Sequence, residues 1–519
     1  MFGRLRHFLV GHPLPTQQLG EERLNKVRAL AAFSPDALSS IAYANQEIYL
    51  ALMLAGSAGL SLAAPIGLAI TGLLLIVALS YFQTSHGYPS GGGSYVVARE
   101  NLGTLPGLVA AAALMVGYLL TAAVSLTAGV EALASAFPAL WDYRVPAALL
   151  LLGLITLLNL RGLRESGTLM AIPVYLFLVT YLPMLGCGLV RLIAGGPAPL
   201  ASVAAAPVQP LTAALILQAF ASGCTALTGI EAISNGVPAF RAPEARNAGR
   251  TLMVMALLMA LLFLGSTGLV QALAVVAGPQ ETILSALTRR VWGGGAGYLL
   301  IQGATMLILT VAANTSFAGF PRLTAILAGD GFVPRQLAGL GDRLVFSNGI
   351  LVLAGATAVL IVLFGGDSHA LVPLFAVGVF LAFTLSQAGM VLHWHRTRGP
   401  RWQLKAVLNA AGAVATGGTV LVIASNRFFQ GAWITLALIP ILVIAFWQVR
   451  RHYRQVAAQL SLRGLAPPTP PLPHPRVVVP ISGVHRGVII AMAFARSISE
   501  DVTGVYLSLI HLSEPTRPY

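Results

Sequence analysis

Long apolar runs, separated by short polar segments, fill the chain between residues 31 and 449. A helix of about 20 apolar residues is long enough to cross a lipid bilayer. The pattern therefore predicts an all-α, polytopic membrane protein with about 12 transmembrane helices. In chain order the predicted spans are 31–54, 64–85, 106–136, 145–160, 169–193, 211–234, 249–276, 298–326, 347–365, 370–393, 405–425 and 430–449.

Polar residues interrupt the first and the sixth span in a similar way. Residues 37–41 (ALSSI) align with residues 226–230 (ALTGI), and one carboxylate lies beside each segment, Asp36 in the first and Glu231 in the second. In transporters built from inverted repeats, each half contributes one interrupted helix, and the two breaks meet at the substrate site. The repeat therefore predicts a five-plus-five inverted-repeat fold, to which the last two helices are an addition.

Composition agrees with a membrane protein and argues against several other classes. Hydrophobic residues make up 56% of the chain and charged residues only 9%, with a mean hydropathy of +0.80, whereas soluble proteins carry about 25% charged residues. The two cysteines, Cys187 and Cys224, lie in apolar runs, so no disulfide framework is predicted. The sequence contains no zinc-ligand spacing, nucleophile triad or nucleotide fingerprint, so neither an enzyme nor a cofactor is predicted.

The distribution of basic residues predicts the orientation in the membrane. With the N-terminus inside, 22 of the 31 lysines and arginines fall in inside segments and five in outside loops. Cytoplasmic loops of membrane proteins carry such an excess of lysine and arginine. We therefore expect the protein to lie in the bacterial inner membrane with its N-terminus in the cytoplasm. The net charge of +14 is then explained by the basic residues of the inside segments, so no nucleic-acid partner is predicted.

The C-terminal part differs in composition from the spans. A proline-rich stretch at 466–475 indicates a semi-rigid linker, and the residues that follow read as a strand, a helix and a second strand. We expect five regions: a cytoplasmic N-terminal segment, a transmembrane transporter domain, a basic and proline-rich linker, a truncated α/β cytoplasmic tail and an end that is not native. Their predicted bounds are 1–30, 31–450, 451–475, 476–506 and 507–519.

Longer motifs carry a resemblance to a known family. Among them are 36–43 (DALSSIAY), 88–95 (YPSGGGSY), 159–163 (NLRGL) and 226–240 (ALTGIEAISNGVPAF). Over residues 3–460 the chain resembles the amino acid–polyamine–organocation superfamily and, within it, the potassium importers. The resemblance implies a LeuT-like fold and secondary active import of potassium by proton symport, through alternating access.

The resemblance also extends into the tail. In these relatives the tail is a universal-stress-protein-like domain that forms dimers and can bind cyclic di-AMP. The resemblance therefore implies a homodimer, and cyclic di-AMP binding only in a full-length form, because about thirty residues cannot make a complete domain of this kind.

Asp36 and Glu231 are the first candidates for the transport site. An ionisable group inside a membrane is costly and is usually functional. For Asp36 a structural interpretation stays open, because Ser34, Pro35 and Asp36 also suit the first positions of a helix. Glu231 lies inside a span, where we expect no such cap, and a buried acid suits ion binding or proton coupling. Its structural alternative is a hydrogen bond to unwound backbone.

Three hydroxyl residues complete the candidate site. The resemblance implies that potassium is held by Asp36, Tyr43, Thr228 and Glu231, and that Thr121 belongs to the same site. Without the resemblance, Thr121 is equally explained by a bond to its own helix or to a neighbouring one.

Two positions depart from the potassium importers. Gly117 replaces an aspartate and Phe375 replaces a tyrosine, so one carboxylate and one hydroxyl are missing. Backbone carbonyls can still hold a potassium ion. The space beside Gly117 also suits an alternative substrate, an amino acid or another small organic cation or zwitterion, whose carboxylate would lie at a half-helix N-terminus. A channel or a membrane sensor is a further alternative, although no repeated filter sequence is present.

Overall fold

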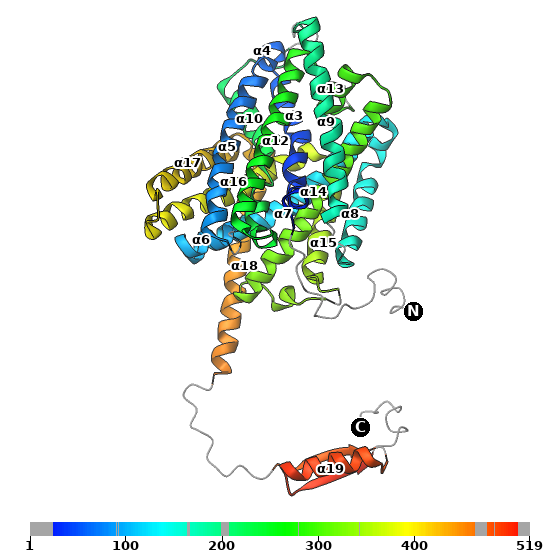
Figure 1. Cartoon of the computed structure of the whole chain (residues 1–519), viewed down its shortest axis with the longest axis vertical. Helices are drawn as coiled ribbons and strands as arrows, with labels where there is room; N and C mark the ends of the chain where they lie inside the picture. The colour runs from blue at the N-terminus through cyan, green and yellow to red at the C-terminus, as the bar shows by residue number, and fades with distance from the viewer. Residues whose placement is uncertain are drawn as a thin grey trace. The chain divides into compact units, whose positions relative to one another are not determined.

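The computed structural model describes residues 24–461 and 475–506, except for 90, 92, 163–166, 199–206, 279, 342 and 482. The predicted non-native end (507–519), most of the N-terminal segment and most of the linker lie outside the described residues. The chain divides into two units, Met1–Tyr453 and Arg454–Tyr519. The first unit is a bundle of long helices, drawn in Figure 1 from blue to orange.

The bounds of the helices agree closely with the apolar runs. In chain order they are α2 Lys26–Phe33, α3 Pro35–Met53, α4 Gly56–Leu60, α5 Ala63–Gly87, α6 Ser94–Leu102, α7 Thr104–Ala136, α8 Arg144–Leu160, α9 Gly167–Gly195, α10 Ala213–Gly223, α11 Ile230–Asn235, α12 Glu244–Ala272, α13 Ile283–Trp292, α14 Ala296–Gly329, α15 Ser347–Leu363, α16 Ser368–Thr397, α17 Trp402–Asn426 and α18 Ala432–Gln459.

Ten helical segments of the described chain are long and apolar enough to cross a membrane. Two of the twelve predicted spans are not among them. The first corresponds to α2 and α3, which are separated by a break and carry several polar residues. The other is α15, an apolar helix of 17 residues. The all-α membrane architecture is confirmed, whereas the count of twelve and the inverted symmetry stay predictions.

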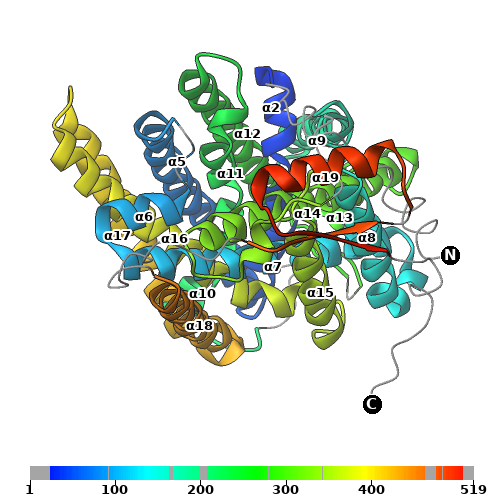
Figure 2. The same cartoon turned by 90° about the horizontal axis from the view of Figure 1, so that it is seen from below.

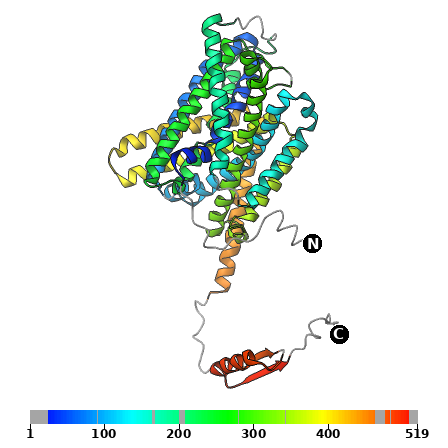
Figure 3. The same cartoon turned by 45° about the vertical axis from the view of Figure 1, so that its right-hand side comes forward.

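The centre of the bundle is formed by α7 and α14, which pack along each other, and α16 packs against α7 on another side. In the view from below, α7 and α14 lie in the middle, whereas α17 lies at the edge (Figure 2). Figure 3 shows the hairpin of α16 and α17, in yellow, at the edge again. The helix α3 contacts both α10 and α14, so the first interrupted segment is surrounded by other helices.

The described part of the second unit forms a small α/β motif. Strands β1 (Val477–Ile481) and β2 (Val502–Tyr506) pair in parallel, with Val477 opposite Val502, and α19 (Arg486–Ile498) connects them. The predicted strand–helix–strand order is therefore confirmed. Two parallel strands run in the same direction, so the chain must return to the starting edge of the sheet between them, and a helix usually forms this crossover.

Candidate functional site

The sixth predicted span is broken where the sequence repeat falls. Helix α10 ends at Gly223, a single 3-10 turn follows (η5, Cys224–Leu227), and Thr228 is extended. Gly229 then has a φ of +79°, and α11 begins at Ile230. A Cβ atom at Gly229 would lie 2.5 Å from the backbone nitrogen of Ala37. Only glycine allows both this backbone angle and this close approach.

The first predicted span is broken at Ser34. Helix α2 ends at Phe33, and α3 begins at Pro35, whose ring suits the first position of a helix. Asp36 lies in the first turn of α3, as the structural interpretation of the sequence expected. However, Ser34 makes no side-chain cap, and its buried hydroxyl has no partner among the described residues.

For Glu231 one expectation was wrong. The sequence analysis predicted no helix start near this residue, but the break at Gly229 places Glu231 in the first turn of α11. Thr228 and Gly229 adopt non-helical angles, so the helix restarts at Ile230, one residue before Glu231. Both candidate carboxylates therefore lie at the start of a helical segment.

The two carboxylates are buried close enough to influence each other electrostatically. Asp36 is 7% exposed and Glu231 is 9% exposed, and the charge of Asp36 acts on Glu231. One oxygen of each, Oδ1 of Asp36 and Oε2 of Glu231, has no hydrogen-bond partner among the described residues. Two buried carboxylates that repel each other are costly to ionise together, so a proton or a cation must accompany them.

Hydroxyl groups connect the two interrupted segments. The Tyr43 and Thr228 hydroxyls are 3.2 Å apart, and the Ser40 hydroxyl donates to the carbonyl of Ala226 at 3.1 Å. These contacts join residues about 185 positions apart in the chain, at the two segments that the repeat singled out. The structure thus brings Asp36, Tyr43, Thr228 and Glu231 into one neighbourhood, while Thr121 is buried on α7.

Tyr118 is a neighbour of this site that the sequence analysis missed. It lies one turn before Thr121 on α7, and Asn235 of α11 donates to its hydroxyl at 3.3 Å. Asn235 ends α11, the helix that carries Glu231, so this bond links Tyr118 to the second interrupted segment. The spacing of three residues from Thr121 was a usable signal, because residues i and i+3 share a helix face.

The two departures from the potassium importers lie where α7 and α16 meet. A Cβ atom on Gly117 would have one neighbour within 4 Å, Cγ2 of Val379 at 3.5 Å. The helices approach closely nearby, since a Cβ atom on Gly378 would lie 3.0 Å from the carbonyl oxygen of Ala113. Phe375 is fully buried on α16. Gly117 and Phe375 therefore have apolar neighbours or an apolar side chain at the two positions where the resemblance leads us to expect oxygen ligands.

Comparison with known proteins identifies the family. The profile of a family described as amino acid permease matches residues 27–448. The chain belongs to this amino acid permease family. It is also 44% identical to the protein named potassium transporter KimA of Bacillus subtilis (strain 168). The alignment spans 511 residues and covers 98% of this chain and 84% of that relative. The predicted family is confirmed, and this member is a multi-pass membrane transporter.

An ion pair joins two segments at one end of this permease. Arg99 of α6 pairs with Asp330, which follows α14, and the Tyr95 hydroxyl donates to the same carboxylate at 2.6 Å. Burial opposes ionisation of Asp330, but the hydrogen bonds from Arg99 and Tyr95 outweigh it, so the pKa of this carboxyl lies below its usual value. The pair therefore favours the packing of α6 against the end of α14.

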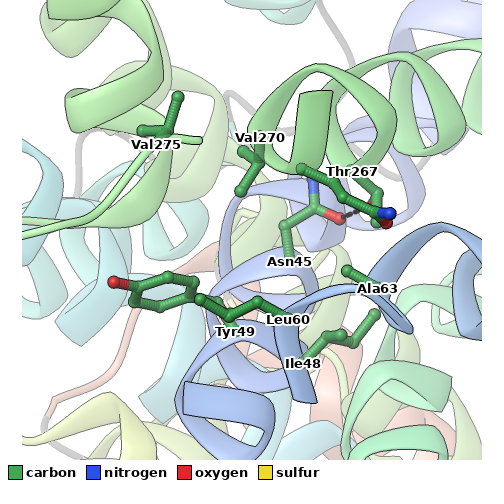
Figure 4. Close-up of a pocket in the computed structure, with 9 residues that line it drawn as sticks. Asn45, Ile48, Tyr49, Leu60, Ala63, Thr267, Val270 and Val275 are labelled. Carbon is green, nitrogen blue, oxygen red and sulfur yellow. Dashed lines mark hydrogen bonds between the residues drawn. The ribbon is translucent and has the colours of Figure 1, made fainter. Parts of the chain in front are cut away.

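A separate pocket lies between α3, α5 and α12, and it is shown in Figure 4. One polar lining residue, Asn45, donates to Ser266 at 2.5 Å and accepts from Thr267 at 2.6 Å. Ile48, Leu60 and Val270 give much of the wall an apolar character. The amide of Asn45 is therefore satisfied by protein groups.

Proposed function

We propose that this permease imports potassium ions together with protons by alternating access. The observation that carries the proposal is the meeting of two interrupted helices at a pair of buried carboxylates. Asp36 and Glu231 each keep one oxygen without a hydrogen-bond partner among the described residues, and the hydroxyls of Tyr43 and Thr228 meet between the same two segments. The name of the Bacillus subtilis relative, potassium transporter, supports the choice of ion.

Charge balance favours coupling to protons. Two carboxylates in a dehydrated site need two positive charges, which a potassium ion and a proton together supply. Glu231 is assigned as the acid linked to the proton or to the ion, and Asp36 as the second charge. Tyr43, Thr121 and Thr228 provide neutral oxygen ligands, since oxygen donors replace the hydration shell of potassium in selective sites.

The direction of transport follows from the proposed orientation. We place the N-terminus in the cytoplasm of a bacterial cell and the protein in the inner membrane, on the distribution of basic residues. A membrane potential of 100 mV, negative inside, contributes about 2.3 kcal/mol for each positive charge that moves inward. When one potassium ion enters together with one proton, two positive charges move inward, and each of them gains this energy.

The alternative substrate is an amino acid or another small organic cation or zwitterion. The specific observation in its favour is the loss of two oxygen ligands at Gly117 and Phe375. Such a substrate would place its carboxylate at the start of α11 or of α3, and its ammonium group against Asp36 or Glu231.

The tail supports two further proposals. We assign it to a universal-stress-protein-like domain through which two copies of the protein associate, and which binds cyclic di-AMP only in a full-length form. The mass of the protein in detergent, compared with that of a version from which the tail after residue 475 is removed, tests the association. The version without the tail is expected to be a single chain.

Growth of a bacterial strain without its own potassium importers tests the function. At micromolar potassium, the wild-type chain should restore growth, and Glu231→Gln should not. The exposed Glu100→Gln on α6 is the matched control, because it removes a carboxylate outside the site. Failure of a well-expressed wild-type protein to restore growth would refute potassium import and favour the organic substrate, to be sought by an amino-acid uptake screen.

A further inference from the structure

A small cavity lined by both apolar and polar side chains borders the candidate site on the side of Tyr43. Its polar lining residues come from α3, α7, the segment before α13, α14 and α16, and they are Tyr43, Gln46, Glu131, Thr282, Thr305, Ser368 and His369. The hydroxyl of Tyr43 also lies next to Thr228, so one side chain separates the cavity from the site around Glu231. The cavity admits a sphere of the size of a water molecule, which is close to the size of a potassium ion.

The hydroxyl of Thr305 has no partner in the part of the chain that the structure describes. Thr305 is 1% exposed, lines the cavity and leaves its Oγ1 atom without a hydrogen bond. Threonines inside helices usually donate to a carbonyl three or four residues earlier. Thr310 on the same helix does so, with a bond of 2.8 Å to Met306. A buried hydroxyl that makes no such bond is costly unless something in the cavity binds it.

Glu131 supplies the negative charge of the cavity. Its carboxylate accepts hydrogen bonds from the backbone N–H of Ser368, at 2.8 Å, and from the Ser368 hydroxyl. These bonds cap the start of α16, which is a structural role. Each carboxylate oxygen nevertheless has a second lone pair for another ligand. The bonds by which Glu131 caps α16 do not explain why the hydroxyl of Thr305 has no partner among the described residues.

The charges around the mouth of the cavity leave room for one more positive charge. His369 also lines the cavity, and its Nδ1 lies 2.7 Å from a carboxylate oxygen of Glu47. A guanidinium nitrogen of Arg427 lies 3.5 Å from the other oxygen of Glu47. Asp367, whose carboxylate accepts from the backbone N–H of His369, adds a third negative charge beside Glu47 and Glu131. With a cationic imidazole, these three carboxylates face two positive charges, so the group carries one net negative charge, which suits a monovalent cation.

We propose that this cavity is a second, outer cation site of the transporter, in addition to the site between the interrupted helices. A monovalent metal ion binds there to oxygens of Glu131 and Thr305 and to Oε1 of Gln46, which also accepts a hydrogen bond from the backbone N–H of Ile283. The ion then passes Tyr43 to reach Glu231. Oxygen ligands from several elements are the donor set that a hard monovalent cation prefers. The inference rests on the proposed function, cation import, and on the proposed orientation of the bundle.

The test exchanges the unpartnered hydroxyl for a methyl group. Thr305→Val keeps the shape of the side chain and breaks no hydrogen bond between residues that the structure describes. The matched control is Thr357→Val on α15, because Thr357 is also fully buried and its hydroxyl has no partner in the described part of the chain, but it does not line the cavity. Potassium uptake is measured in liposomes that contain the purified protein. Loss of one oxygen ligand should raise the KM for potassium about five-fold in Thr305→Val, with no change in Thr357→Val.

A binding measurement separates the outer site from the central one. In the Glu231→Gln background, we expect thermal unfolding in detergent to remain sensitive to replacement of N-methylglucamine by potassium. The sensitivity should disappear when Thr305→Val is added. Complete loss of potassium stabilisation in Glu231→Gln alone, or equal stabilisation with and without Thr305→Val, would overturn the outer site.

The two proposals fail in different ways. A wild-type protein that neither binds nor transports potassium refutes the proposed function. A wild-type protein that transports potassium, with a Thr305→Val variant of identical KM, refutes the outer site alone.

Discussion

Replacing Gly229 by alanine tests whether the contact between the two interrupted helices determines the site. Gly229 has a φ of +79°, a left-handed conformation that costs a non-glycine residue about 1–2 kcal/mol. The new Cβ atom would also lie 2.5 Å from the nitrogen and 3.0 Å from the Cα of Ala37. Since both neighbours are backbone atoms, α3 must move, and such overpacking costs about 1–3 kcal/mol. We expect a total destabilisation of about 2–5 kcal/mol.

Two measurements on purified protein check this prediction. Denaturant unfolding in detergent gives the loss of stability, and liposome uptake of potassium gives the loss of function. Because movement of α3 separates Tyr43 from Thr228, uptake per folded molecule should fall as well. Gly268→Ala is the control, since its Cβ atom would have no neighbour within 4 Å and its position in α12 is helical. That control should be neutral or up to about 1 kcal/mol more stable.

The reasoning would be refuted by a Gly229→Ala protein with wild-type stability and wild-type uptake. Such a result would mean that the segment at 228–230 can move away from α3 without cost. The close approach to Ala37 would then not be what positions the site.

Three further variants test single contacts. Tyr43→Phe keeps the ring and removes the hydroxyl that lies 3.2 Å from Thr228; the KM for potassium should rise about five-fold in liposome uptake, with little change in unfolding. Glu47→Gln leaves two cationic neighbours without a counter-charge in a buried position, and denaturant unfolding should show a loss of about 3 kcal/mol. Asp330→Asn removes the ion pair with Arg99, whose side chain is 38% exposed, and should cost about 1 kcal/mol.

The ion pair of Asp330 also predicts a pH dependence. Its pKa is lower in the folded protein than in the unfolded chain, where an aspartate titrates near about 3.9. The stabilisation is therefore complete above that value and is lost as the pH falls through the lower, folded pKa. Wild type should lose its advantage over Asp330→Asn below about pH 4. An advantage that persists unchanged at lower pH would contradict this assignment.

Outcomes for the other two variants are equally clear. A Tyr43→Phe protein with unchanged KM would remove this hydroxyl from the proposed ion path. A Glu47→Gln protein as stable as wild type would show that water reaches His369 and Arg427 and replaces the lost charge.

The positions of the membrane helices were predictable from the sequence alone. In a bilayer each backbone polar group must be satisfied within its own segment, so a long apolar run is helical whatever its neighbours are. The predicted spans 106–136 and 145–160 correspond to α7 and α8 within two residues. The breaks were predictable as well, because small and polar residues interrupt both apolar runs at matching places.

Which side chains meet was decided only by the tertiary structure. Tyr43 and Thr228 are 185 positions apart, and Glu131 and Ser368 are 237 positions apart. Nothing local in the sequence joins such pairs, because their contact depends on how each helix is rotated and how closely its neighbours pack. The spacing from Thr121 places Tyr118 on the same face of α7, but only the packing of the helices shows that Asn235 of α11 donates to its hydroxyl. The sequence thus determined the helices and their interruptions, and the packing of the bundle determined the site.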